Sequence, residues 1–157
     1  MNEQFSKEDI LQRQYDWGNG IIHIGKIFTE KGDYVKAAKE HIADLYGYGE
    51  SKVLFKPTKA TDPQFRANKE EALSYFVGEN DKFPEDQGFA LQPWEKVRFE
   101  VHGFIANINQ AIIMGNYFFI DANGTETKVE YTMGFFRATD GSLKLNLHHS
   151  SFPFQPE

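Results

Sequence analysis

Hydrophobic residues recur at steps of three and four in the first half of the chain and at steps of two in the second half. The first spacing is typical of amphipathic helices, and the second is typical of strands with one buried face. Helices are expected over about residues 7–30, 33–46 and 67–77, and a short strand over 53–55 ends before Pro57. This order predicts an α+β domain whose helices pack on one face of an antiparallel sheet.

The first predicted helix has a clear start and an ambiguous middle. Ser6 is a candidate N-cap, and Glu8 and Asp9 follow in the first turn, where carboxylates are favoured. Gly18 and Gly20 weaken the pattern, because each glycine in a helix interior costs about 1 kcal/mol. They predict either a break at this point or a close contact with another element.

The second half of the chain predicts a meander of strands joined by tight turns. Four alternating runs are found, at about residues 96–103, 111–120, 127–137 and 143–151. Asn123-Gly124, between the second and third runs, is a strong hairpin signal. Three helices followed by long strands predict the cone of the nuclear-transport-factor-like fold, with a pocket between sheet and helices. We expect residues 1–157 to form this single domain.

Composition excludes several classes of site and partner. The 157 residues include no cysteine, which rules out disulfides, thiol nucleophiles and thiolate metal sites. The net charge of -6 and the lack of a basic tract argue against nucleic acid as a partner. No apolar run reaches the roughly 18 residues that span a membrane, and the first residues lack the pattern of a secretory signal. We therefore expect a cytoplasmic protein with no membrane partner.

The last predicted strand carries the most informative polar residues. If its alternation is uninterrupted, His149 and Ser151 share the buried face with the leucines of that strand, while His148 and Ser150 face away. A buried imidazole and a buried hydroxyl need polar partners, since leaving either unpaired costs about 1–3 kcal/mol. The alternative is a histidine that only satisfies its own hydrogen bonds in the core.

Two hydroxyl groups in the first half are further candidates. Thr58 follows Pro57 at the end of the short strand, where a fixed backbone presents the hydroxyl to a ligand or simply forms a turn. Tyr75 lies beside the apolar face of the third helix, and its phenol either enters the pocket or stays half-buried at the surface. Lys56 and Arg66 are cations near the loops that either attract an anion or remain solvated.

Several familiar catalytic patterns are absent from the sequence. There is no Gly-x-Ser-x-Gly elbow and no glycine-rich phosphate loop. His23, His41 and His102 have no metal-ligand spacing to one another. An isomerase on this cone would need a carboxylate facing the pocket, but Asp121 lies at a turn and Glu130 alternates outward.

Six segments together resemble the iota-class carbonic anhydrases, which are relatives of the association domain of calcium/calmodulin-dependent kinase. These segments are Val53-Leu54-Phe55-Lys56-Pro57-Thr58, Tyr75-Phe76-Val77-Gly78, Gly88-Phe89-Ala90-Leu91-Gln92-Pro93-Trp94, Gly115-Asn116-Tyr117, Tyr131-Thr132-Met133-Gly134 and His148-His149-Ser150-Ser151. The resemblance covers nearly the whole chain and is to the short, single-domain bacterial or cyanobacterial form. The final His-His-Ser-Ser is its most specific part.

The resemblance implies an enzyme that catalyses the reversible hydration of carbon dioxide to bicarbonate. Carried onto this sequence, it implies that Thr58, Tyr75 and Ser151 are hydroxyl donors and acceptors around bicarbonate and that His149 is the neighbouring imidazole. It implies no cofactor, with zinc or manganese left open because some members of the class are described as metal-dependent. Two alternatives remain: a non-catalytic oligomerisation or small-ligand-binding module, and a dehydratase or isomerase of the same fold.

The strand expected at 111–120 has apolar residues on both of its faces. Ile112 and Met114 alternate with Ile113 and Tyr117 along it. Only one face can pack against the helices, so the other needs a different cover. We therefore expect a homodimer or a higher even oligomer formed through the sheet, with carbon dioxide or bicarbonate as the small-molecule partner.

Overall fold

The computed structural model describes residues 5–157, and within them the chain forms helices first and a sheet afterwards. The helical elements are α1 (Lys7–Thr29), α2 (Tyr34–Leu45), α3 (Lys69–Val77) and the short 3-10 helix η1 (Phe89–Leu91). The strands are β1 (Leu54–Lys56), β2 (Trp94–Ala106), β3 (Ala111–Asp121), β4 (Glu126–Arg137) and β5 (Leu143–Ser151). The elements expected from the hydrophobic pattern are all present, which confirms the α+β class.

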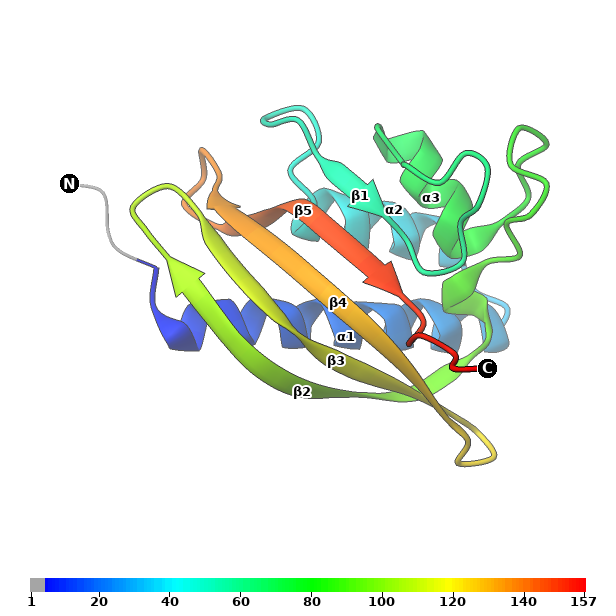
Figure 1. Cartoon of the computed structure of the whole chain (residues 1–157). Coiled ribbons are helices and arrows are strands. Elements are labelled where there is room, and N and C mark those ends of the chain that lie inside the picture. The colour runs from blue at the N-terminus through cyan, green and yellow to red at the C-terminus, as the bar shows by residue number, and fades with distance from the viewer. Residues whose placement is uncertain (1–4) are drawn as a thin grey trace.

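The five strands form one sheet in the order β1-β5-β4-β3-β2. Strands β2 to β5 are an antiparallel meander, as expected. The short edge strand β1 is parallel to β5, so the sheet is mixed rather than wholly antiparallel. Figure 1 shows α1 and α2 together on one face of this curved sheet, with α1 running obliquely behind the strands. In the part of the chain described, no helix is long and apolar enough to cross a membrane.

Helix α1 is continuous through its two central glycines. Its N-cap is Ser6, whose hydroxyl accepts from the backbone amide of Asp9 at 3.0 Å, as the sequence predicted. A Cβ on Gly18 would lie 3.0 Å from the ring of Phe99 in β2. A Cβ on Gly20 would lie 2.1 Å from Nδ1 of His41 in α2. The glycines therefore mark close contacts rather than a break.

Strand β5 contains an irregularity that the sequence did not reveal. Leu145 pairs with Phe135 and Leu147 pairs with Gly134, so Asn146 is an extra residue that forms a β-bulge. The side chain of Asn146 is held by Gln110, with two amide hydrogen bonds of 2.8 and 3.1 Å. Beyond the bulge the two faces of the strand are exchanged.

The exchange reverses the predicted orientation of the last residues. His148 pairs with Met133 and Ser150 pairs with Tyr131, and these paired residues are all buried. His149 pairs with Thr132 on the opposite face and is exposed. The prediction that His149 and Ser151 face the helices is therefore wrong, because it assumed a strand without a bulge.

The two faces of β3 differ in exposure as the alternation predicted. Ala111, Ile113 and Phe119 are buried against the helices. On the other face, Ile112 is 38% and Met114 is 54% exposed in the single chain. The core therefore lies between the sheet and the helices, while an apolar outer face of the sheet remains open.

Candidate active site

A single buried imidazole stands at the centre of the polar groups between sheet and helices. His148 is 1% exposed, and both of its ring nitrogens have polar neighbours. Nδ1 lies 2.7 Å from the hydroxyl of Tyr46, at the end of α2. Nε2 lies 3.1 Å from the hydroxyl of Tyr117 in β3 and 3.3 Å from Oγ of Ser150. The bulge in β5 is what brings this histidine inward.

Tyr117 and Ser150 join the imidazole in a hydroxyl cluster. The Tyr117 hydroxyl is hydrogen-bonded to Oγ of Ser150 as well as to His148. Both side chains project from the inner face of the sheet, and both residues are at most 2% exposed. The cluster therefore offers two hydroxyls and one imidazole within hydrogen-bond distance of one another.

Thr58 and Tyr75 form a second hydroxyl pair. The Tyr75 hydroxyl accepts from the backbone amide of Lys59 at 3.2 Å, and the side chain of Thr58, the preceding residue, lies near the same oxygen. The turn after β1 thus holds the phenol of α3 in place. With its oxygen occupied by these contacts, Tyr75 can donate its own hydrogen to a bound ligand.

Lys56 and Phe55 contact both the His148 cluster and the Thr58–Tyr75 pair. The ammonium of Lys56 lies 3.1 Å from the carbonyl oxygen of Ser150 and 3.5 Å from that of Thr58, so both main chains converge on it. The ring of Phe55 stacks on His148 with centroids 5.1 Å apart and meets the ring of Tyr75 edge-on at 6.3 Å. Phe55 is therefore a shared apolar wall that suits a small, apolar molecule.

A pocket of about 460 Å³ opens beside Tyr75. Its lining includes Lys59, Glu85, Gln87 and Phe89. Phe89 stacks on Tyr75 at 5.5 Å, between the pocket and the core. Tyr75 itself lines this pocket, which therefore connects the Thr58–Tyr75 pair with solvent.

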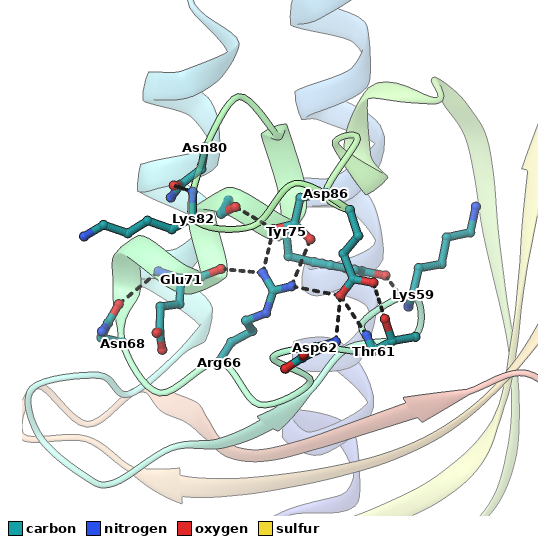
Figure 2. A network of polar contacts seen from close by, with 12 residues as sticks. Lys59, Thr61, Asp62, Arg66, Asn68, Glu71, Tyr75, Asn80, Lys82 and Asp86 are labelled. Carbon is teal, nitrogen blue, oxygen red and sulfur yellow. Dashed lines mark hydrogen bonds and ion pairs between the residues drawn. The ribbon is translucent and has the colours of Figure 1, made fainter.

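A buried ion pair holds the elements that carry Thr58 and Tyr75. Arg66 and Asp86 have side chains that are both 0% exposed, and they share two hydrogen bonds of 2.7 and 2.9 Å. Ser74 of α3 donates to the same carboxylate. Figure 2 shows the Arg66 guanidinium between α3 and the loops that precede and follow this helix, with Tyr75 alongside. Arg66 is thus a structural cation and not a solvated one.

Burial determines the protonation of the site. It lowers the pKa of His148 to about 3, with smaller effects of His41 and His149 in the same direction. It raises the pKa of Tyr46, Tyr117 and Tyr75 well above the usual value for a phenol. The site therefore holds a neutral imidazole and neutral hydroxyls near pH 7.

The family described as "Metal-independent carbonic anhydrase" matches residues 8–152, which is nearly the whole chain. This chain belongs to that family. The reaction of the family is the reversible hydration of carbon dioxide to bicarbonate, as the resemblance in the sequence implied. The family's description agrees with the expectation of a site without a cofactor.

Individual relatives of this carbonic anhydrase agree in sequence and in fold. A metal-independent carbonic anhydrase of Nostoc sp. strain PCC 7120 is 39% identical, over 99% of this chain and 77% of the relative. The crystal structure of a cyanobacterial iota-carbonic anhydrase complexed with bicarbonate has a TM-score of 0.95 and 36% identity, covering 99% of this chain and 97% of that one.

More distant structures show the fold alone. A protein of Xanthomonas campestris named for the calcium/calmodulin-dependent protein kinase II association domain has a TM-score of 0.59 and 19% identity, covering 97% of this chain and 91% of that one. A protein of the NTF2-like family from Streptomyces avermitilis has a TM-score of 0.60 and 13% identity, covering 94% and 96%. They confirm the nuclear-transport-factor-like cone.

The structure separates the four residues that the sequence selected in this carbonic anhydrase. Thr58 and Tyr75 lie close together on the inner side, where the amide of Lys59 donates to the Tyr75 hydroxyl. His149 and Ser151 line a different pocket, of about 430 Å³, on the outer face of the sheet with Met114, Asn116 and Thr132. The inner positions are occupied by His148 and Ser150 instead. The predicted convergence of all four side chains on one pocket is thus wrong for the two residues of β5.

Sequence reasoning also missed two aromatic members of the cluster, Tyr46 and Tyr117. In the sequence Tyr117 counts only as an apolar residue on one of the two faces of its strand, although a phenol buried beside hydroxyls usually has a polar partner. Tyr46 follows the end of α2 and carries no periodic signal. Its role depends on the distant residue His148, so the local sequence contains no sign of it.

The donor set of this site does not resemble a zinc or manganese site. It has one imidazole, whose two nitrogens are both engaged by protein groups, and otherwise neutral hydroxyls. Among residues 5–157, no group of three or more His, Asp or Glu side chains is placed to hold a metal ion. The reaction proposed for this site therefore involves its hydroxyl groups and its imidazole.

The two buried histidines are expected to make stability fall in acid. Burial lowers the pKa of His41 to about 4 and that of His148 to about 3, against about 6.5 in the unfolded chain. Below pH 6.5 the unfolded state binds protons that the folded state excludes. Each histidine then removes up to about 1.4 kcal/mol of stability per pH unit until its folded pKa is reached. Denaturant melts between pH 7 and 4 measure this slope.

The variant His41→Gln isolates one of these contributions. Its stability should decline less steeply between pH 6.5 and 4 than that of the parent, by about 1.4 kcal/mol per pH unit. His23→Gln is the control, because His23 is exposed on α1 and is only the smallest of the causes that act on the pKa of His41. Equal slopes for the parent and His41→Gln would contradict the assignment of a buried neutral His41.

Proposed function

We propose that carbon dioxide is hydrated between the His148–Ser150–Tyr117 cluster and the Thr58–Tyr75 pair. The observation that carries this assignment is the hydrogen bonding of His148 and Ser150 to Tyr117 inside an otherwise aromatic core. Each buried polar group needs a hydrogen-bond partner, so a cluster of them in an aromatic core usually marks a functional site. Bicarbonate, the ligand of the cyanobacterial relative, is the anion these donors would hold.

The side chains that would touch the substrate are neutral, so the barrier must be lowered by hydrogen bonds. A water molecule held by the hydroxyls attacks the carbon of carbon dioxide, and the electron pair of one C=O bond moves to its oxygen. Hydroxyl hydrogens of Ser150 and Tyr75 donate to the oxygens on which negative charge grows. Donors fixed in a dry site stabilise such charge more than water does, because they need no reorganisation. The aromatic wall of Phe55 keeps the site dry.

The proton of the attacking water must also leave the site. A neutral hydroxyl is a poor base, and the buried His148 resists protonation because burial lowers its pKa to about 3. We assign the proton to solvent water that enters through the pocket beside Tyr75. The sum is then one carbon dioxide and two waters giving bicarbonate and hydronium.

Comparing His148→Gln with His149→Gln tests the location of the site. We expect His148→Gln to lower kcat/KM for carbon dioxide hydration in stopped-flow assays by about 10²-fold, the usual size of a lost catalytic contact. His149→Gln should retain activity within about twofold, because its side chain lies on the outer face. Each variant is assayed with and without a chelator after its fold is checked by circular dichroism. An inactive His149→Gln with an active His148→Gln would overturn the assignment.

We also propose that two chains pair through the outer faces of their sheets, giving a homodimer or a higher even oligomer. The supporting observation is the exposed apolar surface there, in which Ile105 is 77% and Met114 is 54% exposed. Surfaces of this kind on a sheet usually mark an interface. His149 and Ser151, which border the same face, would then lie at or near that interface.

Introducing a charge on the outer face is expected to separate the chains. Light scattering at about tens of micromolar should report a mass of at least twice 18.1 kDa for the parent. Met114→Asp should shift it to the mass of one chain, since an unpaired buried charge costs several kcal/mol. Phe28→Asp, on the exposed side of α1, is the control and should remain oligomeric. A parent protein of single-chain mass would refute the proposal.

A further inference from the structure

A chain of hydrogen bonds runs from the indole of Trp17, which can only donate, to the hydroxyl of Ser150. The indole N–H of Trp17 lies 3.0 Å from the hydroxyl oxygen of Tyr46. An indole has no acceptor, so Tyr46 must accept from Trp17. The hydrogen of Tyr46 therefore has to point away from Trp17. The same hydroxyl lies 2.7 Å from Nδ1 of His148.

This fixed direction distinguishes the two neutral forms of His148. A neutral imidazole carries its hydrogen either on Nδ1 or on Nε2. With the hydrogen on Nδ1, the Tyr46 oxygen would face two N–H groups, and its own hydrogen would have no acceptor within residues 5–157. Tyr46 is 1% exposed, so solvent does not replace the missing partner. A buried donor left unpaired disfavours this form by about 5- to 150-fold relative to a form whose free hydrogen meets a ligand or water at the proposed site.

With the hydrogen on Nε2, every hydrogen of the chain except that of Ser150 has an acceptor within the chain. Trp17 donates to Tyr46, and Tyr46 donates to Nδ1. Nε2–H then points to Tyr117, at 3.1 Å, and to Ser150, at 3.3 Å. The Tyr117 hydroxyl donates a hydrogen bond to Oγ of Ser150. The hydroxyl hydrogen of Ser150 is the last in the chain and remains available for a ligand.

We propose that Trp17 and Tyr46 are positioning residues that fix His148 as the Nε2–H tautomer, so that His148 acts in this site as a hydrogen-bond donor and not as a base. The hydrogen bond made by one ring nitrogen sets the role of the other. The donor chain then presents a hydroxyl hydrogen to the oxygen on which negative charge develops. The effect on rate rests on the proposed role of Ser150, whereas the tautomer is measured independently of activity.

Nitrogen NMR of the full-length protein tests the tautomer directly. In protein labelled with ¹⁵N at histidine, long-range couplings from the ring carbons identify which nitrogen of His148 is protonated, and His148→Gln assigns the signals. At neutral pH we expect Nε2 to be protonated and Nδ1 to be an acceptor. A protonated Nδ1 would overturn the inference even if His148→Gln is inactive, so the two proposals fail separately.

Three aromatic variants test the positioning role. Tyr46→Phe removes the donor to Nδ1, and its Nδ1 signal should move toward that of an unbonded nitrogen while kcat falls by about tenfold or more. Trp17→Phe keeps a ring against Tyr117 but removes the N–H, so the Nδ1–H form should become detectable. Tyr48→Phe is the matched control, because it removes a buried hydroxyl that bonds only to the carbonyl of Arg66.

The readouts separate positioning from general destabilisation. Tyr48→Phe should lower the melting temperature about as much as Tyr46→Phe, yet keep the parent tautomer and kcat. An equal loss of kcat in both variants would reduce Tyr46 to a structural role and overturn the proposal. If Tyr46→Phe does not fold, the tautomer ratio in Trp17→Phe decides, and a ratio unchanged from the parent contradicts the inference.

Discussion

Replacing Ser150 with alanine is expected to lower kcat for carbon dioxide hydration by about 10²- to 10³-fold. The hydroxyl is the inner end of the cluster of Tyr117 and His148, and its hydrogen is placed to stabilise the oxygen that becomes negatively charged. Losing one such donor from a buried site typically has an effect of this size. Stopped-flow assays of the pH change on mixing with carbon dioxide measure it.

Ser151→Ala is the matched control for this prediction. Ser151 is the next residue of β5 and lines the outer pocket with Asn116 and Thr132. Its removal should change kcat by less than about twofold, because no step of the proposed mechanism touches it. Ser150→Ala itself should lose only about 1–3 kcal/mol of stability, from the unpaired hydroxyl of Tyr117. An inactive Ser151→Ala beside an active Ser150→Ala would restore the orientation first predicted from the sequence.

Asp86→Asn is expected to have the largest effect on stability, a loss of about 3–5 kcal/mol. The change removes the negative charge that faces the Arg66 guanidinium, and both side chains are 0% exposed. An uncompensated charge in such a place is costly because solvent does not reach Arg66, and the remaining carboxylate, that of Glu85, lies 4.0 Å away. Chemical denaturation of both proteins at pH 7 measures the difference.

Glu126→Gln makes the same chemical change in an exposed ion pair. Glu126 lies 3.2 Å from Arg98, and the two side chains are 45% and 41% exposed. Exposed pairs are worth about 0–1 kcal/mol, so this variant should be nearly as stable as the parent. Similar losses in Asp86→Asn and Glu126→Gln would show that burial of the Arg66 pair is not the source of its effect.

The ion pair also matters for the enzyme because of what it joins. Arg66 takes no part in the proposed reaction. Its backbone amide donates to the carbonyl of Phe55, and its guanidinium donates to the carbonyl of Glu71. It therefore ties β1 to α3, the two elements that present Thr58 and Tyr75. Partial loss of activity in Asp86→Asn below its melting temperature would follow from displacement of this hydroxyl pair.

Local patterns in the sequence were enough to predict the elements of the fold. The Ser6 cap, the amphipathic face of α1 and the Asn123-Gly124 hairpin each act over a few residues, so each can be read without knowledge of the rest. Gly124 adopts a φ of 80°, and Gly78 at the end of α3 a φ of 70°, as turn and cap glycines do. These signals also fixed the order of helices and strands, and with it the α+β class.

The proximity of Thr58 and Tyr75 followed from the same kind of reasoning. Pro57 places Thr58 at the end of a short strand, and the turn there meets Tyr75 on α3. The resemblance to a family singled out the His-His-Ser-Ser segment, and it could not decide which histidine and serine face inward. That decision required the register of β5 against β4.

The sequence by itself determined the elements, the composition of the core and the segments that carry the chemistry. The tertiary structure alone decided that His148 and Ser150, rather than His149 and Ser151, face the core and the proposed site. The reason is physical: one extra residue at Asn146, stabilised by Gln110 from the β2–β3 connection, exchanges the faces of the strand. A bulge is a property of pairing between strands, and its stabilising contact lies 36 residues away along the chain. Period-two alternation within one strand has no means of signalling it.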